Sequence, residues 1–303
     1  MKDFKISYQE RSHILTFDIL HEQNSDDIFQ YFQVSRKSRY RYYCQKCVTV
    51  NHQIITQNTL LPPHSRLQIA PLPDDIPSIT PCFKEITVCY EDELCLIVSK
   101  PPKMLVHSDG VHCADTLHNC IQAYYDAHQI RTPIRSIHRL DYETSGLVFY
   151  CKMPFFQGYF DEQLKQKKIE RIYLAWVLGQ ITAPLTITKA IGRDRHDAKK
   201  MRVSKTGMSA HTEVIPLLLR DNITLVKCLL KTGRTHQIRV HLADAHHPIL
   251  SDPLYGSPNT QIKRCALHAW QLRFMHPLYE KMITVCDIPP EDMHINPTVL
   301  SDL

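Results

Sequence analysis

The chain has 303 residues, of which 43% are hydrophobic and 22% charged, and its net charge is +5. This balance is typical of a soluble globular protein with one large domain and room for a small one. The first residues contain no apolar segment of the signal-peptide kind, and no apolar run reaches the roughly 18 residues of a membrane span, so secretion and membrane insertion are not expected. Eleven cysteines without regular spacing indicate reduced thiols, which favours the cytoplasm.

The basic residues concentrate in two stretches. Between residues 28 and 73 there is no Asp or Glu, and residues 189–205 hold seven Lys or Arg against two Asp. Such asymmetry suits a polyanionic partner that touches only certain faces, although ordinary solvated charge explains either stretch alone equally well. The residues expected to contact the backbone of such a partner are Arg36, Lys37, Arg39, Arg41, Lys199, Lys200 and Arg202.

Residues 1–70 are expected to form a small first domain. Ser25 is placed to cap a short helix that runs to Phe32, and Ser35 a second helix that runs to Cys44. A short strand at 48–51 and an extended stretch at 66–69 complete this domain. The prolines and aspartates of residues 71–83 predict a stiff, exposed linker.

Residues 84–303 form the second predicted domain. Apolar patterns predict strands on either side of an acidic turn within residues 88–98, and further strands at 172–178 and 223–230. Asp115 is expected to cap a helix, and residues 156–164 have helical spacing. Strands outnumber helices and seldom alternate with them, which favours a mixed α+β fold over a doubly wound parallel sheet.

One segment, residues 138–148 (HRLDYETSGLV), has the features of a reactive loop. Residues 134–140 and 147–151 are predicted to be strands, and residues 144–146 are turn formers between them. Asp141 would be presented on a loop held by rigid strands, where scaffolds often carry reactive groups. An ordinary surface turn could also hold an aspartate.

A second segment, residues 232–242 (TGRTHQIRVHL), contains a glycine turn followed by a helical pattern. Arg234 would project from the turn, and a guanidinium beside a carboxylate lowers the pKa of that carboxylate. Arg239 and His241 are expected either to contact phosphate or to satisfy buried backbone groups. Residues 248–256 (PILSDPLYG) continue the motif.

Aromatic and apolar strand residues provide the third group of candidates. In residues 168–177 (KIERIYLAWV), Tyr173 shares a strand face with other apolar residues, so its default interpretation is a core aromatic. Leu267 lies in residues 266–277 (ALHAWQLRFMHP), and residues 98–107 (VSKPPKMLVH) contain a Lys-Pro turn.

Together these segments resemble the RluA family of RNA pseudouridine synthases over residues 84–285, which is too long a match to arise by chance. The resemblance implies a catalytic domain built on a mixed, largely antiparallel sheet, and a reaction that needs no metal and no other cofactor. It implies that Asp141 is the nucleophile and that Arg234 pairs with it. Tyr173 would stack on the target base and could remove the proton from carbon 5, and Leu267 would form an apolar floor under the base.

The resemblance also implies how the substrate is held. His138, Arg139 and Arg239 are expected to bind the substrate together with Leu267. Residues 1–70 resemble the small α/β RNA-binding domain, first named from a small-subunit ribosomal protein, that precedes many catalytic domains of this family. Several glycines of that module are missing here, so residues 1–70 are interpreted as a degenerate copy.

The expected function is conversion of specific uridines to pseudouridine in RNA by a monomer, with large-subunit ribosomal RNA favoured and transfer RNA as an alternative. Because RNA is recognised mostly by shape and by splayed bases, no short motif reveals the target. A non-catalytic RNA-binding or assembly protein is the other alternative, but a retired scaffold should lose the nucleophile or its partner. Cys44 and Cys47 have zinc-pair spacing without a second pair, so no metal site is predicted.

Overall fold

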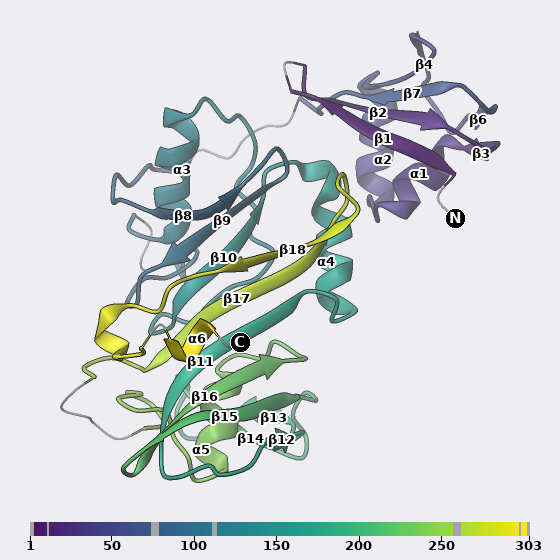
Figure 1. Cartoon of the computed structure of the whole chain (residues 1–303). Coiled ribbons are helices and arrows are strands. Elements are labelled where there is room, and N and C mark those ends of the chain that lie inside the picture. Colours follow the sequence, from purple (N-terminus) through teal and green to yellow (C-terminus); the bar gives the residue numbers. More distant parts are fainter. Residues whose placement is uncertain are drawn as a thin grey trace.

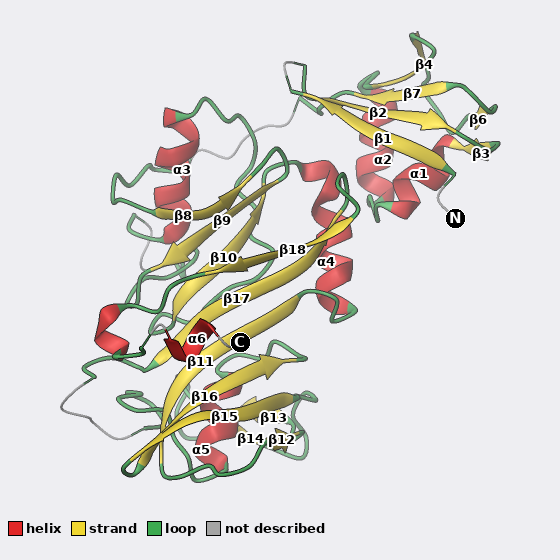
Figure 2. Ribbon diagram, in the orientation of Figure 1, coloured by secondary structure: helices red, strands yellow, loops and turns green. Residues whose placement is uncertain are grey.

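The computed structural model describes residues 3–10, 12–73, 79–110, 114–256, 262–296 and 298–301, which fold around two main sheets (Figure 1). The smaller sheet belongs to the N-terminal unit, purple and blue in Figure 1, and the larger sheet to the rest of the chain. Strands dominate over helices, as Figure 2 shows, which confirms the predicted α+β class. None of the helices in the described residues is long and apolar enough to cross a membrane.

The N-terminal unit is a five-stranded sheet in the order β1-β2-β7-β4-β5, with two helices on one face. The predicted strands at 48–51 and 66–69 are confirmed as β4 and β7, but the hairpin of β1 and β2 was not predicted. The elements are β1 (Phe4–Gln9), β2 (Ile14–Ile19), β3 (Gln23–Asn24), α1 (Ser25–Tyr31), α2 (Arg36–Cys44), β4 (Val48–Val50), β5 (Gln53–Ile54), β6 (Leu60–Leu61) and β7 (Arg66–Ile69).

Both predicted helices of this unit are present, but one of their two caps was wrongly assigned. Ser35 caps α2 as predicted, because its hydroxyl accepts the backbone N–H of Ser38 at 3.1 Å. The N-cap of α1 is Asn24, whose backbone N–H donates to the Asp27 carboxylate in a capping box. The hydroxyl of Ser25 instead bonds that of Tyr43, 2.7 Å away in the interior of the unit.

The large sheet has the order β12-β15-β16-β11-β17-β10-β9-β8, with β18 paired to β17. All its pairings are antiparallel except that of β10 with β17. β13 (Ile191–Arg193) and β14 (Met201–Val203) form a separate two-stranded ribbon. The strands of the large sheet are β8 (Thr87–Glu91), β9 (Cys95–Lys100), β10 (Ser145–Cys151), β11 (Glu170–Leu178), β12 (Leu185–Ile187), β15 (Thr212–Arg220), β16 (Ile223–Leu230), β17 (Leu267–His276) and β18 (Lys281–Cys286).

The remaining helices mostly follow the predicted pattern. The predicted helix cap Asp115 is wrong, because the Thr116 hydroxyl accepts the N–H of Asn119 and caps the helix one residue later. The helical spacing of residues 156–164 is confirmed. These helices are α3 (Leu117–Ala127), η1 (Pro154–Phe156), α4 (Gln157–Lys165), α5 (Gln237–Asp244), η2 (Glu291–Met293) and α6 (Thr298–Ser301).

The strand predicted at residues 134–140 is wrong. This segment makes a single bridge, between Ser136 and Tyr150, and is otherwise irregular. β9 pairs along one edge of β10, and β17 takes only the first two residues of the other edge. The segment runs beside the rest of that second edge, where the N–H of Ile137 donates to Phe149 at 2.8 Å, and then leaves the sheet toward Asp141.

The N-terminal unit shares one hydrophobic cluster with the large sheet. The ring of Phe155, in η1, is only 3% exposed. Ring centroids of the N-terminal unit lie 5.5–6.1 Å from that of Phe155, and they belong to Phe17, Phe29, Phe32 and Tyr42. Residues 74–78 of the predicted linker lie outside the described residues, and just after them the N–H of Cys82 donates to Asn119 of α3. The two units therefore do not have separate cores.

Candidate active site

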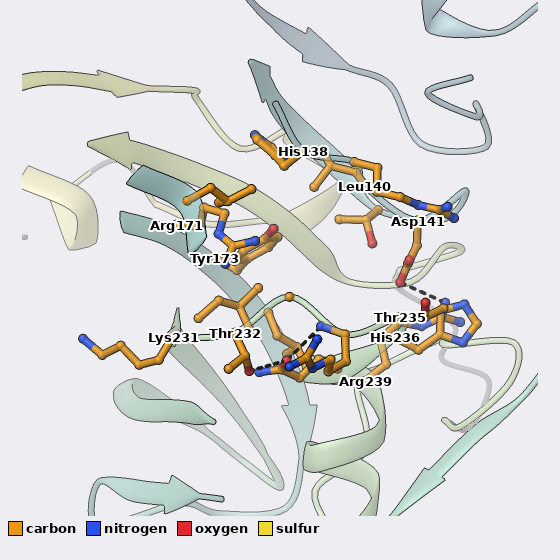
Figure 3. Close-up of a pocket in the computed structure, with 18 of the residues that line it drawn as sticks. His138, Leu140, Asp141, Arg171, Tyr173, Lys231, Thr232, Thr235, His236 and Arg239 are labelled. Atoms are coloured by element: carbon orange, nitrogen blue, oxygen red, sulfur yellow. Dashed lines mark hydrogen bonds and ion pairs between the residues drawn. The ribbon is translucent and has the colours of Figure 1, made fainter. Parts of the chain in front are cut away.

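A pocket of about 650 Å³ opens beside β11, β16, the start of α5 and the loop that carries Asp141. Figure 3 shows that side chains from these separate segments converge on it. Seven residues singled out from the sequence line it: His138, Arg139, Asp141, Tyr173, Arg234, Arg239 and Leu267. The fold thus brings together every predicted catalytic and substrate-binding residue, although they span nearly 130 positions of the chain.

The Asp141 loop is a tight turn that several hydrogen bonds hold in place. The N–H of Thr144 donates to the Asp141 carbonyl at 3.1 Å, which closes the turn. The next carbonyl, that of Tyr142, accepts from the Lys103 N–H at 2.8 Å and from the Lys100 Nζ at 3.4 Å. Lys100 is fully buried, and burial lowers its pKa to about 7 although Asp141 and Glu143 act in the opposite direction. This lysine anchors the turn and was not singled out from the sequence.

The Ser-Gly pair after the turn joins the loop to β17. Ser145 and Gly146 pair in parallel with His268 and Ala269, and the Ser145 hydroxyl lies 3.0 Å from His268 Nδ1. Gly146 has a φ of +111°, and a Cβ there would lie 2.3 Å from the Ala269 carbonyl oxygen. Only glycine allows this close approach. The pairing holds the turn next to Leu267, the residue before His268.

The carboxylate of Asp141 faces Arg239, not Arg234, which corrects the predicted ion pair. Nη1 of Arg239 lies 3.5 Å from Asp141 Oδ2, and the side chain of Asp141 is only 19% exposed. Arg239 is itself held by Asp252, which accepts from its Nε and Nη2 at 2.7 Å each. Burial alone would lower the pKa of Arg239, but Asp252 and the charge of Asp141 raise it, so the guanidinium remains charged.

Arg234 sits on the turn before α5 and points elsewhere. Its Nε donates to the carbonyl of Ser209 at 2.9 Å, and no ion pair to Asp141 is found among the described residues. The turn is organised by Gln237, whose Oε1 accepts from the Thr232 hydroxyl at 2.7 Å and from the Arg234 N–H at 3.0 Å. This geometry fixes the backbone of Arg234 and leaves its guanidinium as part of the pocket wall.

The structure shows what the buried basic residues of α5 contact within the chain. The partners of Arg239 are the carboxylates of Asp141 and Asp252, and no backbone group is among them in the described residues. His241 does satisfy a buried backbone group, because its Nε2 lies 2.8 Å from the carbonyl of Lys189 and its Nδ1 lies 2.9 Å from the Thr212 hydroxyl. An arginine flanked by apolar residues, with an aspartate in the following motif, is the sequence signal that could have identified Arg239 and Asp252 as a pair.

His236 and Tyr255 connect the site to the β13–β14 ribbon. His236 has a φ of +56°, a conformation that is costly for a residue other than glycine. Its Nδ1 lies 2.8 Å from the Tyr255 hydroxyl, which in turn accepts the N–H of Met201 in β14 at 2.7 Å. The Arg239 guanidinium lies over the Tyr255 ring at 5.3 Å. Neither His236 nor Tyr255 was singled out from the sequence.

Tyr173 and Leu267 form an apolar wall from two neighbouring strands. Tyr173 pairs with Ala269 and Ala175 with Leu267 across β11 and β17, so all four side chains project from one face. Tyr173 is 5% exposed and Leu267 3%. Burial, assisted by Asp141 and partly opposed by Arg171, raises the pKa of Tyr173 to about 12, so its phenol keeps its proton at neutral pH.

The two residues before Leu140 face different surroundings. His138 is buried, and burial together with the charge of Arg171 lowers its pKa to about 3, which keeps the imidazole neutral. Arg139 is exposed and lines the rim of the pocket. His138 therefore contributes a polar, uncharged wall and Arg139 an exposed positive charge in the pocket lining.

The predicted RNA-backbone residues do not line the pocket. Arg36, Lys37, Arg39 and Arg41 lie on or at the start of α2, and Lys199, Lys200 and Arg202 lie in and before β14. Arg36, Lys37 and Lys199 are exposed. Arg39 is less available than predicted, because its Nη1 pairs with Asp26 at 2.8 Å.

One group of side chains among the described residues has the spacing of metal ligands, namely Asp92, Cys95 and His276. His276 Nδ1 accepts the N–H of Tyr279, so its Nε2 carries the proton that faces Asp92 at 3.1 Å. Asp92 also accepts the backbone N–H groups of Leu94 and Cys95 at 2.8 Å. The ion-pair contact between His276 and Asp92, together with the backbone N–H groups that Asp92 accepts, accounts for its geometry.

The chain is similar in sequence to several known proteins. A profile of the RNA pseudouridylate synthase family matches residues 94–244. The chain is 35% identical over 250 residues to an uncharacterised RNA pseudouridine synthase of Bacillus subtilis, covering 81% of this chain and 82% of that protein. It is 36% identical over 220 residues to the ribosomal large subunit pseudouridine synthase D of Nitrosomonas europaea, covering 69% of this chain and 63% of that protein.

A solved structure shows the same fold. The human RNA pseudouridylate synthase domain containing 1 matches with a TM-score of 0.58 and 24% identity, over 70% of this chain and 87% of that one.

Proposed function

Because the chain belongs to the RluA family of RNA pseudouridine synthases, we propose that it converts specific uridines of large-subunit ribosomal RNA to pseudouridine. The reaction breaks the bond between ribose C1′ and uracil N1, turns the base and forms a bond from C1′ to C5. The proton that leaves C5 is balanced by one taken up at N1, so the product is an isomer of the substrate. Such a site needs an ionised carboxylate near the sugar and a pocket that holds the freed base.

The carboxylate of Asp141 is the observation that carries this function. It faces a guanidinium that is locked in place by a second carboxylate, at the entrance of a pocket with an apolar wall. Asp141 is therefore assigned as the nucleophile and Arg239 as the residue that pairs with it and orients it. This pairing also argues against a retired scaffold, since both partners are in place.

The wall formed by Tyr173 and Leu267 suits a flipped uracil. Enzymes that act on a base must take it out of the stack and hold it between apolar or aromatic side chains. The ring of Tyr173 provides a stacking surface, and Leu267 lies on the same face of the sheet. Because the raised pKa keeps the phenol protonated, stacking is favoured over direct removal of the C5 proton by a phenolate.

The ribosomal target is supported by the relatives. The Nitrosomonas relative is named for the ribosomal large subunit. Transfer RNA is the second candidate, because only 63% of that relative is matched. We propose that the protein acts in the cytoplasm. We also propose that a single copy of the chain is active, because all its predicted catalytic residues line one pocket. The exposed residues Arg36, Lys37 and Lys199 are the proposed contacts to the RNA backbone, which predicts binding that weakens steeply with salt.

The first experiment measures tritium release from RNA labelled at C5 of uridine. The purified protein is incubated with separate ribosomal and transfer RNA pools. We expect the wild type to release tritium from the ribosomal pool and Asp141→Asn to release none. RNA binding of this variant should change little, because phosphate contacts dominate affinity. Release from the transfer RNA pool alone would overturn the ribosomal target. Absence of release from either pool, with binding intact, would overturn the catalytic function.

A further inference from the structure

The guanidinium of Arg171 lines the pocket, and its Nε is buried without a hydrogen-bond partner. Arg171 lies in β11 and is 9% exposed, and its Nε has no hydrogen-bond partner. Among the described residues it forms no ion pair with a carboxylate. Burial lowers its pKa, and the only group that acts in the opposite direction is Tyr173. An uncompensated buried charge is costly, so its presence in a pocket points to an anion that arrives from outside.

Two other buried arginines show how the charge of a buried guanidinium is balanced within this chain. Arg239 has Asp252 at 2.7 Å, and Arg264 has Asp292 at 2.7 Å, both with two hydrogen bonds to the carboxylate. Each therefore brings its counter-charge from within the chain. Arg171 differs from both in that respect, although all three are at least nine-tenths buried.

The backbone around Arg171 leaves room for its guanidinium. A Cβ at Gly233 would lie 2.8 Å from Arg171 Nη1, so the glycine of the turn before α5 allows the guanidinium to approach the backbone. The lining of the pocket holds seven Lys or Arg side chains against two Asp. Asp161 accepts a hydrogen bond from Gln157 at 3.0 Å, and Asp141 faces Arg239. The pocket as a whole is thus positive.

Arg171 and Tyr173 face the pocket from the same strand. Residues two apart on a strand project from one face and lie about 7 Å apart. Figure 3 draws both on one side of the pocket, across from Asp141 and Arg239. This separation is comparable to that between a base and the phosphate of its own nucleotide. A base that stacks on Tyr173 would therefore bring a phosphate toward Arg171.

We propose that Arg171 binds a phosphodiester group of the RNA, adjacent to the nucleotide whose base stacks on Tyr173. The planar, forked guanidinium matches two phosphate oxygens, which a lysine at this position does not. The phosphate provides the negative charge that Arg171 lacks within the chain. Entry of the RNA into the pocket therefore neutralises the buried guanidinium. This inference rests on the proposed function for the identity of the ligand.

The test compares Arg171→Met with Arg273→Met, and hexauridylate is the probe. Arg273 lies on the neighbouring strand β17, is half-exposed and pairs with Glu170, so the control removes the same charge outside the pocket. Arg171→Met is expected to weaken binding about 10-fold or more, as expected for a lost charge-assisted hydrogen bond. The slope of log K against log salt should become shallower by about 0.7, the value for one phosphate contact to a single strand. The control should leave both quantities close to those of the wild type.

The thermal midpoint of the RNA-free protein provides a second readout. Arg171→Met should keep or raise the midpoint, because it removes an uncompensated charge, whereas Arg239→Met should lower it by leaving the buried carboxylate of Asp252 unpaired. Hexauridylate should raise the midpoint of the wild type more than that of Arg171→Met. A variant Arg171→Met that is less stable, or unfolded, would show that Arg171 has a structural role and would overturn the proposal.

The remaining outcomes are also decisive. Loss of affinity with an unchanged salt slope would mean that the guanidinium stacks on a base, and equal losses for both variants would mean that only net charge matters. Either result overturns the phosphate site. Because hexauridylate binding needs no turnover, the phosphate site can fail while tritium release persists, and the proposed function can fail while the binding result stands.

Discussion

Asp252 accepts two hydrogen bonds of 2.7 Å from Nε and Nη2 of Arg239, and this contact directs the remaining Nη1 toward the pocket. Asp252 is buried, and its carboxylate also accepts the N–H groups of Leu254 and Tyr255. Burial alone would raise the pKa of Asp252, but Arg239 and the backbone donors lower it. The arginine that faces Asp141 is thus fixed by a charge that belongs to the fold and does not take part in substrate binding.

Removing that charge should destabilise the protein. Asp252→Asn keeps the shape of the side chain but leaves Arg239 with a weaker partner, and breaking a buried ion pair costs about 3–5 kcal/mol. The free energy of unfolding, measured by urea denaturation, should fall by this amount. Asp18→Asn is the control, because Asp18 forms an exposed pair with Arg66 and should change stability by less than about 1 kcal/mol. Equal effects of the two substitutions would contradict the structural importance assigned to Asp252.

The two arginines of the second motif should differ in their effect on turnover. Arg239→Lys retains a charge but loses the forked contact, and displacing one preorganised donor lowers kcat about 100-fold or more. Arg234→Lys should leave kcat within about 3-fold, since Arg234 bonds a backbone carbonyl and lies apart from the nucleophile. Single-turnover tritium release measures both. A larger loss of kcat for Arg234→Lys would instead support the predicted ion pair between Arg234 and Asp141.

Gly146 should be irreplaceable for steric reasons. Gly146→Ala combines a left-handed φ with a clash against the Ala269 carbonyl. Together these two effects should lower the free energy of unfolding by about 3 kcal/mol or more. Gly110→Ala is the matched control, because Gly110 has a φ of +91° but no atom of the described residues comes within 4 Å of the added Cβ. Its cost should be only the backbone term, about 1–2 kcal/mol. Thermal unfolding of the two variants should rank them in this order.

Stability should fall as the pH drops below about 6.5. Burial lowers the pKa values of His118 and His268 to about 4 and that of His138 to about 3. Between these values and about 6.5 the unfolded chain binds protons that the native state does not, so each histidine contributes stability that is lost as the pH falls, at about 1.4 kcal/mol per pH unit.

Urea denaturation at pH 7, 6 and 5 measures this dependence. His138→Gln should reduce the loss of stability between pH 6 and pH 5 by about 1 kcal/mol, because one of the six histidines whose pKa is lowered by burial is removed. His21→Gln, on the surface, is the control and should not change it. An unchanged pH dependence in His138→Gln would mean that the native imidazole is already protonated.

Local patterns in the sequence carried much of the fold. The hydroxyl of Ser35 and the glycine turn before α5 were predictable because capping and turn chemistry act within a few residues. Strand β1 could also have been found, since Phe4, Ile6 and Tyr8 alternate with polar residues. The strand predicted at 134–140 failed because the segment makes only one bridge to β10 and then leaves the sheet toward Asp141.

The pairing of charges in the site could not be read in the same way. Arg234 and Arg239 are five residues apart in one motif, and only the direction of α5 decides which of them faces Asp141. The isolation of Arg171 is a property of what the fold does not place nearby, and no local pattern encodes such an absence. The motifs identified the set of residues, and tertiary geometry assigned their contacts.

The burial of Phe155 in the N-terminal unit bears on how this architecture can change over time. Four rings from that unit cover Phe155, so deleting residues 1–70 would leave an aromatic patch bare on the remainder and invite aggregation. Substitutions at the exposed surface of that unit carry no such penalty. The surface of the unit can therefore change while selection for solubility keeps its core in the gene.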